Sequence, residues 1–515
     1  MSRQTLRDLA VGGSLANLCF IAGWDEVLQV NRNSYLRDVS TASVVAVMLD
    51  VLLLGLAFAG AMTLVRRSGN ARALWTAKAA FLLVVLLPLM QIFPDLHVSK
   101  LIRFVARALE PPNHVIRGAD LNPLFPLLAI GLWPARGVKV TRTVVAFLLP
   151  LTLVTFGRAG WRLAAGDVTA TNADRALAPP VPRPARAAPR VIIVLFDEMD
   201  FRLAYSERPT GIVLPELDRL RGEAFFASQA FPPGRKTEVS VPGLLAGRPV
   251  TWDRRRGTDT LLVRFAGTSD TVSWADQPNL FDRARALGYN PGVVGWYHPY
   301  CRLFTSRLTR CFWLPHKGAI LRARVRGSLP QQMLDLFWSL NPLGDRGRHI
   351  ADHVGLLAEA RAAVADTSLG LAFVHLAVPH YPPIYDREDD ELTALNYHIN
   401  GYYDNLVLAD RTLGVLRRAL EEADLWDRST VVLTSDHSRR EGEDDWRVPF
   451  VVKLAGQHTG GPAYRAPFNT VALHDLTLAL LRGEVSGGVA RWLDGWRSAN
   501  HHSINTGSRS TVTFR

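Results

Sequence analysis

Hydrophobic residues are distributed differently in the first 160 residues of this chain and in the remainder. The first part contains long apolar runs with few charges. Those at 43–65 and 73–93 have the length of membrane-spanning helices, because about 20 helical residues cross the hydrocarbon core of a bilayer. Residues 143–157 predict a last span, and the short, proline-broken run at 121–134 predicts one before it.

The first apolar run, at 9–24, follows Arg3 and Arg7 in the manner of a signal peptide. Asp25 and Glu26 stand where a cleavage site has small residues, so the run predicts an uncleaved helix. Cytoplasmic loops of membrane proteins are rich in Lys and Arg, and this bias sets the orientation. Basic residues follow the second and fourth spans, which predicts five crossings and an external location beyond residue 160: Arg66, Arg67, Arg72, Arg136, Lys139 and Arg142.

Two polar features interrupt this membrane part. Residues 96–109 carry Lys and Arg in a loop expected outside, and they predict an amphipathic helix at the external interface. Asp50 lies within the second span, either as a functional carboxyl or as a hydrated group near the end of the span.

After residue 160 the pattern changes to short apolar strands that alternate with amphipathic helices. The Ala, Pro and Arg content of 174–190 predicts an extended linker. Interleaved apolar strands and helices then predict a largely parallel sheet covered on both faces, an α/β fold. The predicted strands are 191–196, 370–376 and 430–435, and the predicted helices are 214–224, 278–288, 350–366 and 399–424.

Composition narrows the class of protein. Of the 515 residues, 48% are hydrophobic and 21% are charged, which excludes a disordered chain. The net charge of +12 is spread thinly after the linker and predicts no nucleic-acid groove. Three cysteines are too few for a zinc ribbon or an iron–sulfur cluster. Cys301 and Cys311 would form a disulfide on the outer side or remain two buried thiols, and Cys19 is expected to pack in its helix.

Two predicted strands end in side chains that can bind a metal ion. Asp197 and Glu198 directly follow the first strand, where a carboxylate either caps the next helix or binds a cation. Asp436 and His437 follow the last one. Functional side chains gather at the carboxyl edge of such sheets, and one carboxylate with one imidazole suits Zn²⁺ or Mn²⁺ better than Ca²⁺.

A loop between these strands, 231–249, delivers hydroxyl groups to a helix start. Thr237 and Ser240 follow its Pro-Pro-Gly turn. Thr237 is either a plain helix cap or a nucleophile, because a divalent cation bound to a hydroxyl oxygen stabilises the ionised form.

Taken in order, Asp197, the segment TEVSVP (237–242) and the segment SDH (435–437) resemble the alkaline phosphatase/sulfatase superfamily. TEVSVP is more closely similar to the nucleophile loop of membrane-bound phosphoethanolamine transferases, whose relatives include lipoteichoic acid synthases. The resemblance covers about 190–485. It implies that Thr237 is the nucleophile and a metal ligand, and that Asp197, Asp436 and His437 complete the site of one divalent ion, zinc or manganese.

The same resemblance implies the substrate contacts and the architecture. His380, in HLAVPHYPPIYD (375–386), is expected to contact the substrate phosphate. In the expected mechanism, Lys236 or an arginine also stabilises the charge on the phosphate oxygens. The expected architecture is an α-helical transmembrane bundle followed by an alkaline-phosphatase-like α/β/α sandwich. Its parts are a transmembrane domain (1–160), a linker (161–190), a catalytic domain (191–485) and a carboxyl-terminal tail (486–515).

The function implied is that of a multi-pass transferase of the inner (cytoplasmic) membrane, with its catalytic domain on the periplasmic or extracellular side. It would move a headgroup of the phosphoethanolamine or phosphoglycerol type from a phospholipid to a glycan or glycolipid, through a phospho-threonine. No nucleic acid and no obligate protein partner are expected. The alternatives are a membrane-anchored sulfatase-like hydrolase, acting as a phosphoesterase or phosphodiesterase, and a catalytically degenerate envelope protein.

Two departures bear on these alternatives. Ser438 stands where the family usually has Gly, and no histidine occurs in the segment 438–449, where the transferases often place a further one. These two departures bear on how the second half-reaction would proceed and on which acceptor would be used. True sulfatases carry a Cys or Ser at the position of Thr237, oxidised to an aldehyde hydrate that Thr cannot give, which disfavours the usual sulfate-ester chemistry.

Overall fold

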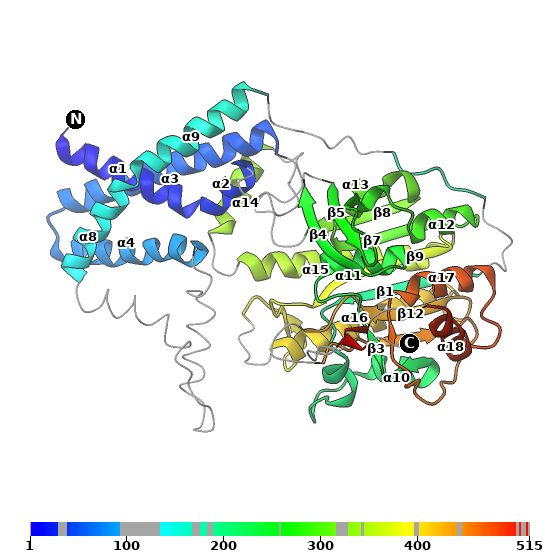
Figure 1. The fold of residues 1–515 in the computed structure, drawn as a ribbon. Coiled ribbons are helices and arrows are strands. Elements are labelled where there is room, and N and C mark those ends of the chain that lie inside the picture. Colours follow the sequence, from blue (N-terminus) through cyan, green and yellow to red (C-terminus); the bar gives the residue numbers. More distant parts are fainter. Residues whose placement is uncertain are drawn as a thin grey trace.

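The computed structural model describes residues 2–28, 39–92, 134–166, 176–182, 189–256, 259–315, 328–340, 344–395, 401–439, 445–500, 504–505 and 511–512. Figure 1 shows two parts. Helices from the start of the chain (blue to cyan) lie together on one side, and the α/β part (green to red) lies on the other.

The amino-terminal part consists of helices in the described ranges: α1 (Arg3–Cys19), α2 (Ile21–Leu28), α3 (Thr41–Arg67), α4 (Ala71–Ile92), α8 (Pro134–Phe147) and α9 (Leu149–Ala164). Two helical stretches among the described residues are long and apolar enough to cross a membrane, Thr41–Arg67 and Val138–Ala164. The run at 9–24, expected as one helix, is divided between α1 and α2. Most of 121–134 and all of 96–109 lie outside the described residues, so the five-span bundle stays a prediction.

Helices α1 and α3 approach each other closely. A Cβ added to Gly12 would lie 2.5 Å from the carbonyl oxygen of Gly55, so only glycine permits this contact. The buried Asp8 of α1 pairs with Arg66 of α3 and, at 2.7 Å, with Arg142 of α8. Asp50 is fully buried in α3, which does not agree with a hydrated carboxyl.

The α/β part is built on a seven-stranded sheet. Strands β12, β1, β9, β7 and β8 run parallel, β13 is antiparallel to β12, and β2 is antiparallel to β13. The predicted strands are confirmed as the three neighbours at the centre, β12, β1 and β9. In spatial order the strands are β2 (Phe225–Ala227), β13 (Phe450–Lys453), β12 (Thr430–Ser435), β1 (Val191–Asp197), β9 (Leu371–Pro379), β7 (Pro291–Tyr297) and β8 (Arg310–Pro315).

Helices cover both faces of this sheet, which makes three layers (Figure 1). Side chains alternate along β1, so Ile193 packs in one apolar core and Ile192 in the other. Each such side chain contributes about 2 kcal/mol by its burial. The first core includes α11 (Thr237–Ala246), α12 (Leu280–Ala286) and α17 (Ala472–Arg482), and the second includes α10 (Pro215–Glu223), α15 (Gly344–Ala365) and α16 (Gly401–Glu422). The predicted helices are found as α10, α12, α15 and α16.

Smaller elements surround this frame. The longest is a hairpin sheet formed by β4 (Val250–Arg256), β5 (Thr260–Phe265) and β6 (Val272–Ser273). Two-residue strands form three further pairs: β3 (Ala230–Phe231) with β14 (Phe468–Asn469), β10 (Tyr385–Asp386) with β11 (Glu391–Leu392), and β15 (Ile504–Asn505) with β16 (Thr511–Val512).

Cys301 and Cys311 form a disulfide, which is one of the two alternatives expected for them. Cys301 belongs to the short helix α13 (Tyr300–Leu303) and Cys311 to β8.

The predicted tail contains helix α18 (Val489–Ala499), and its Leu493 and Trp496 are buried in the first core. This segment is therefore part of the α/β body, because its amphipathic pattern gives it an apolar face to bury.

The two parts of the chain also touch through helix α14 (Leu329–Ser339), which the sequence analysis did not predict. Its Leu336 is fully buried among apolar residues of α1, α2 and α3. The rings of Phe337 and Phe20 meet edge to face, with centroids 5.6 Å apart. The linker is thus not the only connection between the parts.

Candidate active site

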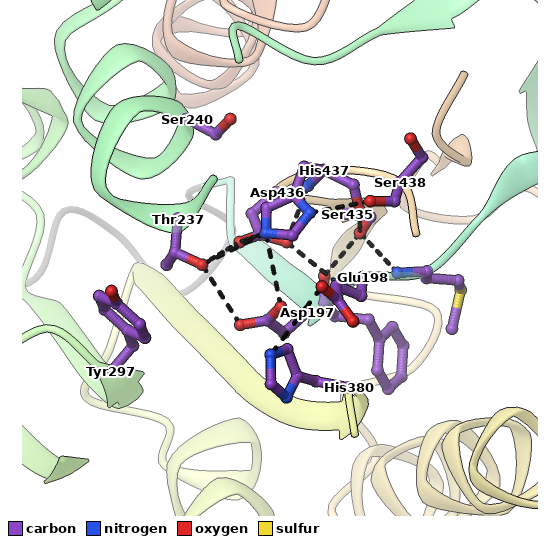
Figure 2. A network of polar contacts seen from close by, with 12 residues as sticks. Asp197, Glu198, Thr237, Ser240, Tyr297, His380, Ser435, Asp436, His437 and Ser438 are labelled. Carbon is purple, nitrogen blue, oxygen red and sulfur yellow. Dashed lines mark hydrogen bonds and ion pairs between the residues drawn. The ribbon is translucent and has the colours of Figure 1, made fainter. Parts of the chain in front are cut away.

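The candidate active site lies at the carboxyl edge of the sheet. Asp197 is the last residue of β1, and Asp436 follows the end of the adjacent β12. These ends are level, because Phe196 pairs with Ser435 in the strand register. Thr237 is the first residue of α11, and Figure 2 shows its hydroxyl directed at the carboxylates.

The hydroxyl of Thr237 lies within short range of all three residues expected around it. It donates a hydrogen bond to Asp436 Oδ2 at 2.8 Å, and its distance to Asp197 Oδ2 is 3.4 Å. His437 Nε2 lies 3.5 Å from the same oxygen. All of these side chains are buried, with at most 1% of each residue exposed. The structure therefore brings the four sequence-predicted residues into one cluster.

Three of these residues can hold a metal ion. One potential ligand atom each from Asp197, Asp436 and His437 lies within 4.8 Å of the others. Carboxylate oxygens and an imidazole nitrogen form a donor set that suits a divalent cation such as Zn²⁺ or Mn²⁺. A buried pair of neighbouring carboxylates also needs positive charge nearby, which such an ion supplies.

Hydrogen bonds to the backbone orient these ligands. Asp436 Oδ1 accepts from the backbone amides of His437, at 2.8 Å, and Glu198, at 3.3 Å. Nδ1 of His437 lies 2.9 Å from the carbonyl oxygen of Ser438. This contact holds the ring with Nε2 facing Thr237, as second contacts do for metal-binding histidines.

The two carboxylate-bearing strand ends are locked together by Ser435. Its Oγ accepts from the amide of Met199 at 2.9 Å and lies 2.8 Å from the carbonyl of Phe196. Both acidic loops therefore leave the sheet in one fixed arrangement.

Ionisation of Asp436 is favoured by its surroundings. Burial alone raises the pKa of this carboxyl, but His437, His375 and the hydrogen bond from Thr237 outweigh that effect and hold the pKa below its ordinary value. Asp436 is thus a charged acceptor for the proton of the threonine hydroxyl.

The turn before Thr237 depends on Gly234. A Cβ at this position would lie 2.6 Å from Cγ1 of Val239. Ser240 Oγ donates to the carbonyl of Gly234 at 2.9 Å and points away from the cluster (Figure 2). Ser240 therefore shapes the turn, and of these two hydroxyl groups it is that of Thr237 that faces the acids.

The expected substrate contacts differ in placement. His380 lies beside the cluster with its side chain 17% exposed, and its Nε2 is 3.9 Å from Oε1 of Glu198 (Figure 2). Lys236 is not directed into the cluster, because its ammonium group pairs with Asp253 of β4 and is 46% exposed.

A buried histidine that was not among the predicted site residues lies on the other side of Thr237. His298, which follows β7, places Nε2 3.2 Å from the carbonyl oxygen of Thr237. Burial lowers the pKa of His298 to about 3, so its ring is neutral near pH 7. Glu238 accepts a hydrogen bond from the hydroxyl of Tyr297 and lies 3.2 Å from Arg255 of the hairpin sheet. The position of His298 at a strand end was an available signal.

His375 was also missed as a site residue. It lies within β9, with Nε2 4.0 Å from Asp197 Oδ2 and Nδ1 2.9 Å from the hydroxyl of Tyr300. Burial lowers its pKa to about 4. A histidine inside an apolar strand gives no signal of this kind, because only the fold shows which neighbours it meets.

No protein-family model matches the chain. A curated relative is an ulvan-active sulfatase of Formosa agariphila, 26% identical over 151 residues, which are 23% of this chain and 30% of that protein. This chain therefore matches less than a third of that relative. Among solved structures, PsFucS1 sulfatase from Pseudoalteromonas sp. is 14% identical, with 62% of this chain and 74% of that chain covered and a TM-score of 0.40. The phosphonate monoester hydrolase of Agrobacterium radiobacter is 13% identical, with 60% of this chain and 77% of that chain covered and a TM-score of 0.39.

These solved structures have TM-scores below 0.5, so the similarity that counts is the one in sequence, together with the motifs. Over 151 residues the chain is thus similar to a sulfatase, and its α/β part carries the motifs that resemble the alkaline phosphatase/sulfatase superfamily.

Proposed function

We propose that this protein is a membrane-anchored, metal-dependent hydrolase of phosphate esters that uses Thr237 as its nucleophile. The observation that carries the proposal is the placement of the threonine hydroxyl. It is buried, donates to the ionised Asp436 at 2.8 Å and lies 3.5 Å from His437. A hydroxyl in such a place has both a proton acceptor and a site for a cation beside it.

A hydrolase is supported better than the transferase implied by the TEVSVP motif. The sequence relative is a sulfatase, and this similarity supports the sulfatase-like alternative. The nucleophile favours phosphate over sulfate as the ester. Because Thr237 carries a methyl group on Cβ, oxidation of its side chain would give a ketone and not the aldehyde of the sulfatases.

In the proposed reaction, the Thr237 oxygen attacks phosphorus and its proton passes to Asp436. The bond from phosphorus to the departing alcohol breaks, and that alcohol takes up a proton from solvent. Water then attacks the phospho-threonine and loses a proton to solvent, and the Thr237–phosphorus bond breaks. The proton held by Asp436 returns to the Thr237 oxygen, and the phosphate product leaves. A zinc or manganese ion held by Asp197, Thr237, Asp436 and His437 would supply positive charge for the phosphate oxygens and favour ionisation of the hydroxyl.

His380 is the remaining residue with a proposed role. It lies at the partly exposed side of the cluster, 3.9 Å from Glu198. From there its imidazole can donate to a non-bridging phosphate oxygen or to the departing alcohol. Lys236 receives no role in this scheme, because Asp253 already engages its charge.

The proposed location is the cytoplasmic membrane, with the catalytic part outside. The surface of α3, α8 and α9 is apolar and exposed at many positions, which water disfavours over so large an area. These positions include Leu52, Leu53, Leu56, Leu64, Phe147, Leu153, Val154 and Trp161. The disulfide between Cys301 and Cys311 supports an oxidising compartment.

Transfer of a phospholipid headgroup to a glycan or glycolipid is the second candidate. The contact of α14 with α1 and α3 favours it, because this contact keeps the α/β part next to the apolar helices and hence near lipid donors. The two reactions share the first half and differ only in the acceptor.

The test uses purified full-length protein with zinc or manganese. The probes are bis(p-nitrophenyl) phosphate, p-nitrophenyl sulfate, and labelled phosphatidylethanolamine with or without a glycan acceptor. We expect release of p-nitrophenol from the phosphate diester, loss of activity with a chelator, and its recovery on addition of metal. Asp436→Asn should lose this activity. Asp253→Asn, which removes the same charge outside the cluster, is its matched control and should keep the activity. Cleavage of the sulfate ester alone would contradict the proposal, and label on the glycan would establish the transferase instead.

A further inference from the structure

A second pocket, of about 500 Å³, opens beside the catalytic edge and shares no lining residue with the metal triad. Its wall includes Phe201, four residues after Asp197, and Arg447, just before β13. Ser228 and Gln229, just after β2, also line it. Since β13 is antiparallel to β12, and β2 to β13, all of these positions fall at the edge that carries Asp436.

The pocket is positively charged. Among the described residues, three arginines line it, Arg221, Arg447 and Arg465, and no acidic residue does. Asp445 neutralises Arg447 through a contact of 2.6 Å. Within the described residues, Arg221 and Arg465 have no carboxylate partner. Two positive charges are therefore available to a ligand.

Aromatic rings hold one of these charges in place. The rings of Phe201, Tyr205 and Phe226 pack against one another, with centroids 4.9 to 5.9 Å apart. The guanidinium carbon of Arg221 lies 4.6 Å from the centroid of Phe226. Cation–π contacts of this kind fix a guanidinium group and leave its N–H donors open toward the pocket.

Tyr205 supports Arg221 from the buried side of the pocket. It lies in the π-helical turn Arg202–Ser206 and is only 8% exposed, yet it lines the pocket. Its hydroxyl oxygen is enclosed by protein, and Asp218, Arg221 and Asp410 are among the charged groups near it. The ring therefore serves the site through its contacts with Arg221 and Phe226, and the arginines supply the donors.

We propose that this pocket is a second anion site, which binds a phosphate- or sulfate-type group of the substrate remote from the ester that is cleaved. The inference rests on the proposed function and deepens it: the substrates are esters with an additional oxyanion. The N–H groups of Arg221 and Arg465 are donors for the several oxygens of such a group.

The first test measures binding and needs no turnover. Full-length Thr237→Ala protein, freed of metal by a chelator, is dialysed against radiolabelled inorganic sulfate. We expect one saturable site that is weakened about tenfold or more by the double change Arg221→Gln and Arg465→Gln. Arg219→Gln removes the same charge from α10 outside the pocket and should have no effect.

The second test asks whether the bound oxyanion belongs to the substrate. Hydrolysis of bis(p-nitrophenyl) phosphate is compared with that of a p-nitrophenyl diester that carries a further phosphate on its other alcohol. The double arginine variant should raise KM about tenfold for the second ester and leave the first unchanged.

Two outcomes would overturn the inference. One is sulfate binding that the double variant does not weaken, or that Arg219→Gln weakens equally. The other is a KM that changes equally for both esters. An effect of free sulfate on hydrolysis of the simple ester, seen only when the pocket is intact, would also count against the inference, because the pocket would then be a regulatory site. Absence of turnover with both esters would instead contradict the proposed function, while sulfate binding would remain measurable.

Discussion

Replacement of Thr237 by valine separates the chemistry of its hydroxyl from its packing. Valine has nearly the same shape, and the site is 1% exposed, so no cavity is created. The change removes the 2.8 Å hydrogen bond to the charged Asp436, which contributes about 1.5–3 kcal/mol to stability. A domain with a free energy of unfolding of about 5–15 kcal/mol stays folded after such a loss.

The effect on catalysis is expected to be far larger. Loss of a nucleophile lowers kcat by about 10⁴-fold or more, which is about 5 kcal/mol or more in activation free energy. Thr237→Ser keeps the hydroxyl and loses one methyl group, so its rate should be about a hundredth of the parent rate or higher. A phosphorylated residue 237 should be trapped from the parent and the serine variant and be absent from the valine variant.

The assay is the initial rate of bis(p-nitrophenyl) phosphate hydrolysis with zinc or manganese, together with Tm and mass spectrometry of peptides that contain residue 237. A valine variant that keeps its Tm and more than a tenth of the parent rate would refute the reasoning. A serine variant as inactive as valine would also count against it, because the hydroxyl would then not be the deciding group.

Three further predictions concern the metal, the disulfide and a buried acid. Asp436→Asn should lose stoichiometric zinc or manganese, measured by elemental analysis, and an equimolar ion in the folded variant would contradict the ligand assignment. Replacement of Cys301 and Cys311 by Ser opens a loop with a sequence separation of 10, and we expect a loss of about 2–3 kcal/mol, seen as a lower Tm that reductant no longer changes. Burial raises the pKa of Asp410 from 3.8 to about 6, so this carboxyl stabilises the fold least above pH 6 and regains its contribution as pH falls toward 4. Asp410→Asn keeps an acceptor for the amide of Leu217, and it should raise stability by about 3 kcal/mol above pH 6 and little near pH 4; a difference independent of pH would exclude this cause.

The elements of the α/β part that could be predicted from sequence are those with a strong local pattern. β1, β9 and β12 are apolar on both faces, and α16 has a clear amphipathic period. Strand order could not be predicted this way, because it depends on pairings between distant residues such as Ile193 with Val432. The packing of helix α14 could not be predicted for a similar reason, since its apolar residues contact helices that lie about 300 residues earlier in the chain.

The candidate site shows the same division. Asp197, Asp436 and His437 stand at strand ends, where position alone suggests function, and the TEVSVP motif pointed to Thr237. The motif did not indicate that Lys236 would turn to Asp253, because that partner belongs to a hairpin with no signal of its own.

The contact made by α14 has a practical consequence for handling the protein. After a protease cuts the Pro- and Arg-rich stretch 174–190, both fragments should elute together in gel filtration. Leu336 and Phe337 would still pack against the amino-terminal helices. The α/β part expressed alone would expose the apolar face of that helix, so removing residues 329–339 as well should improve its yield.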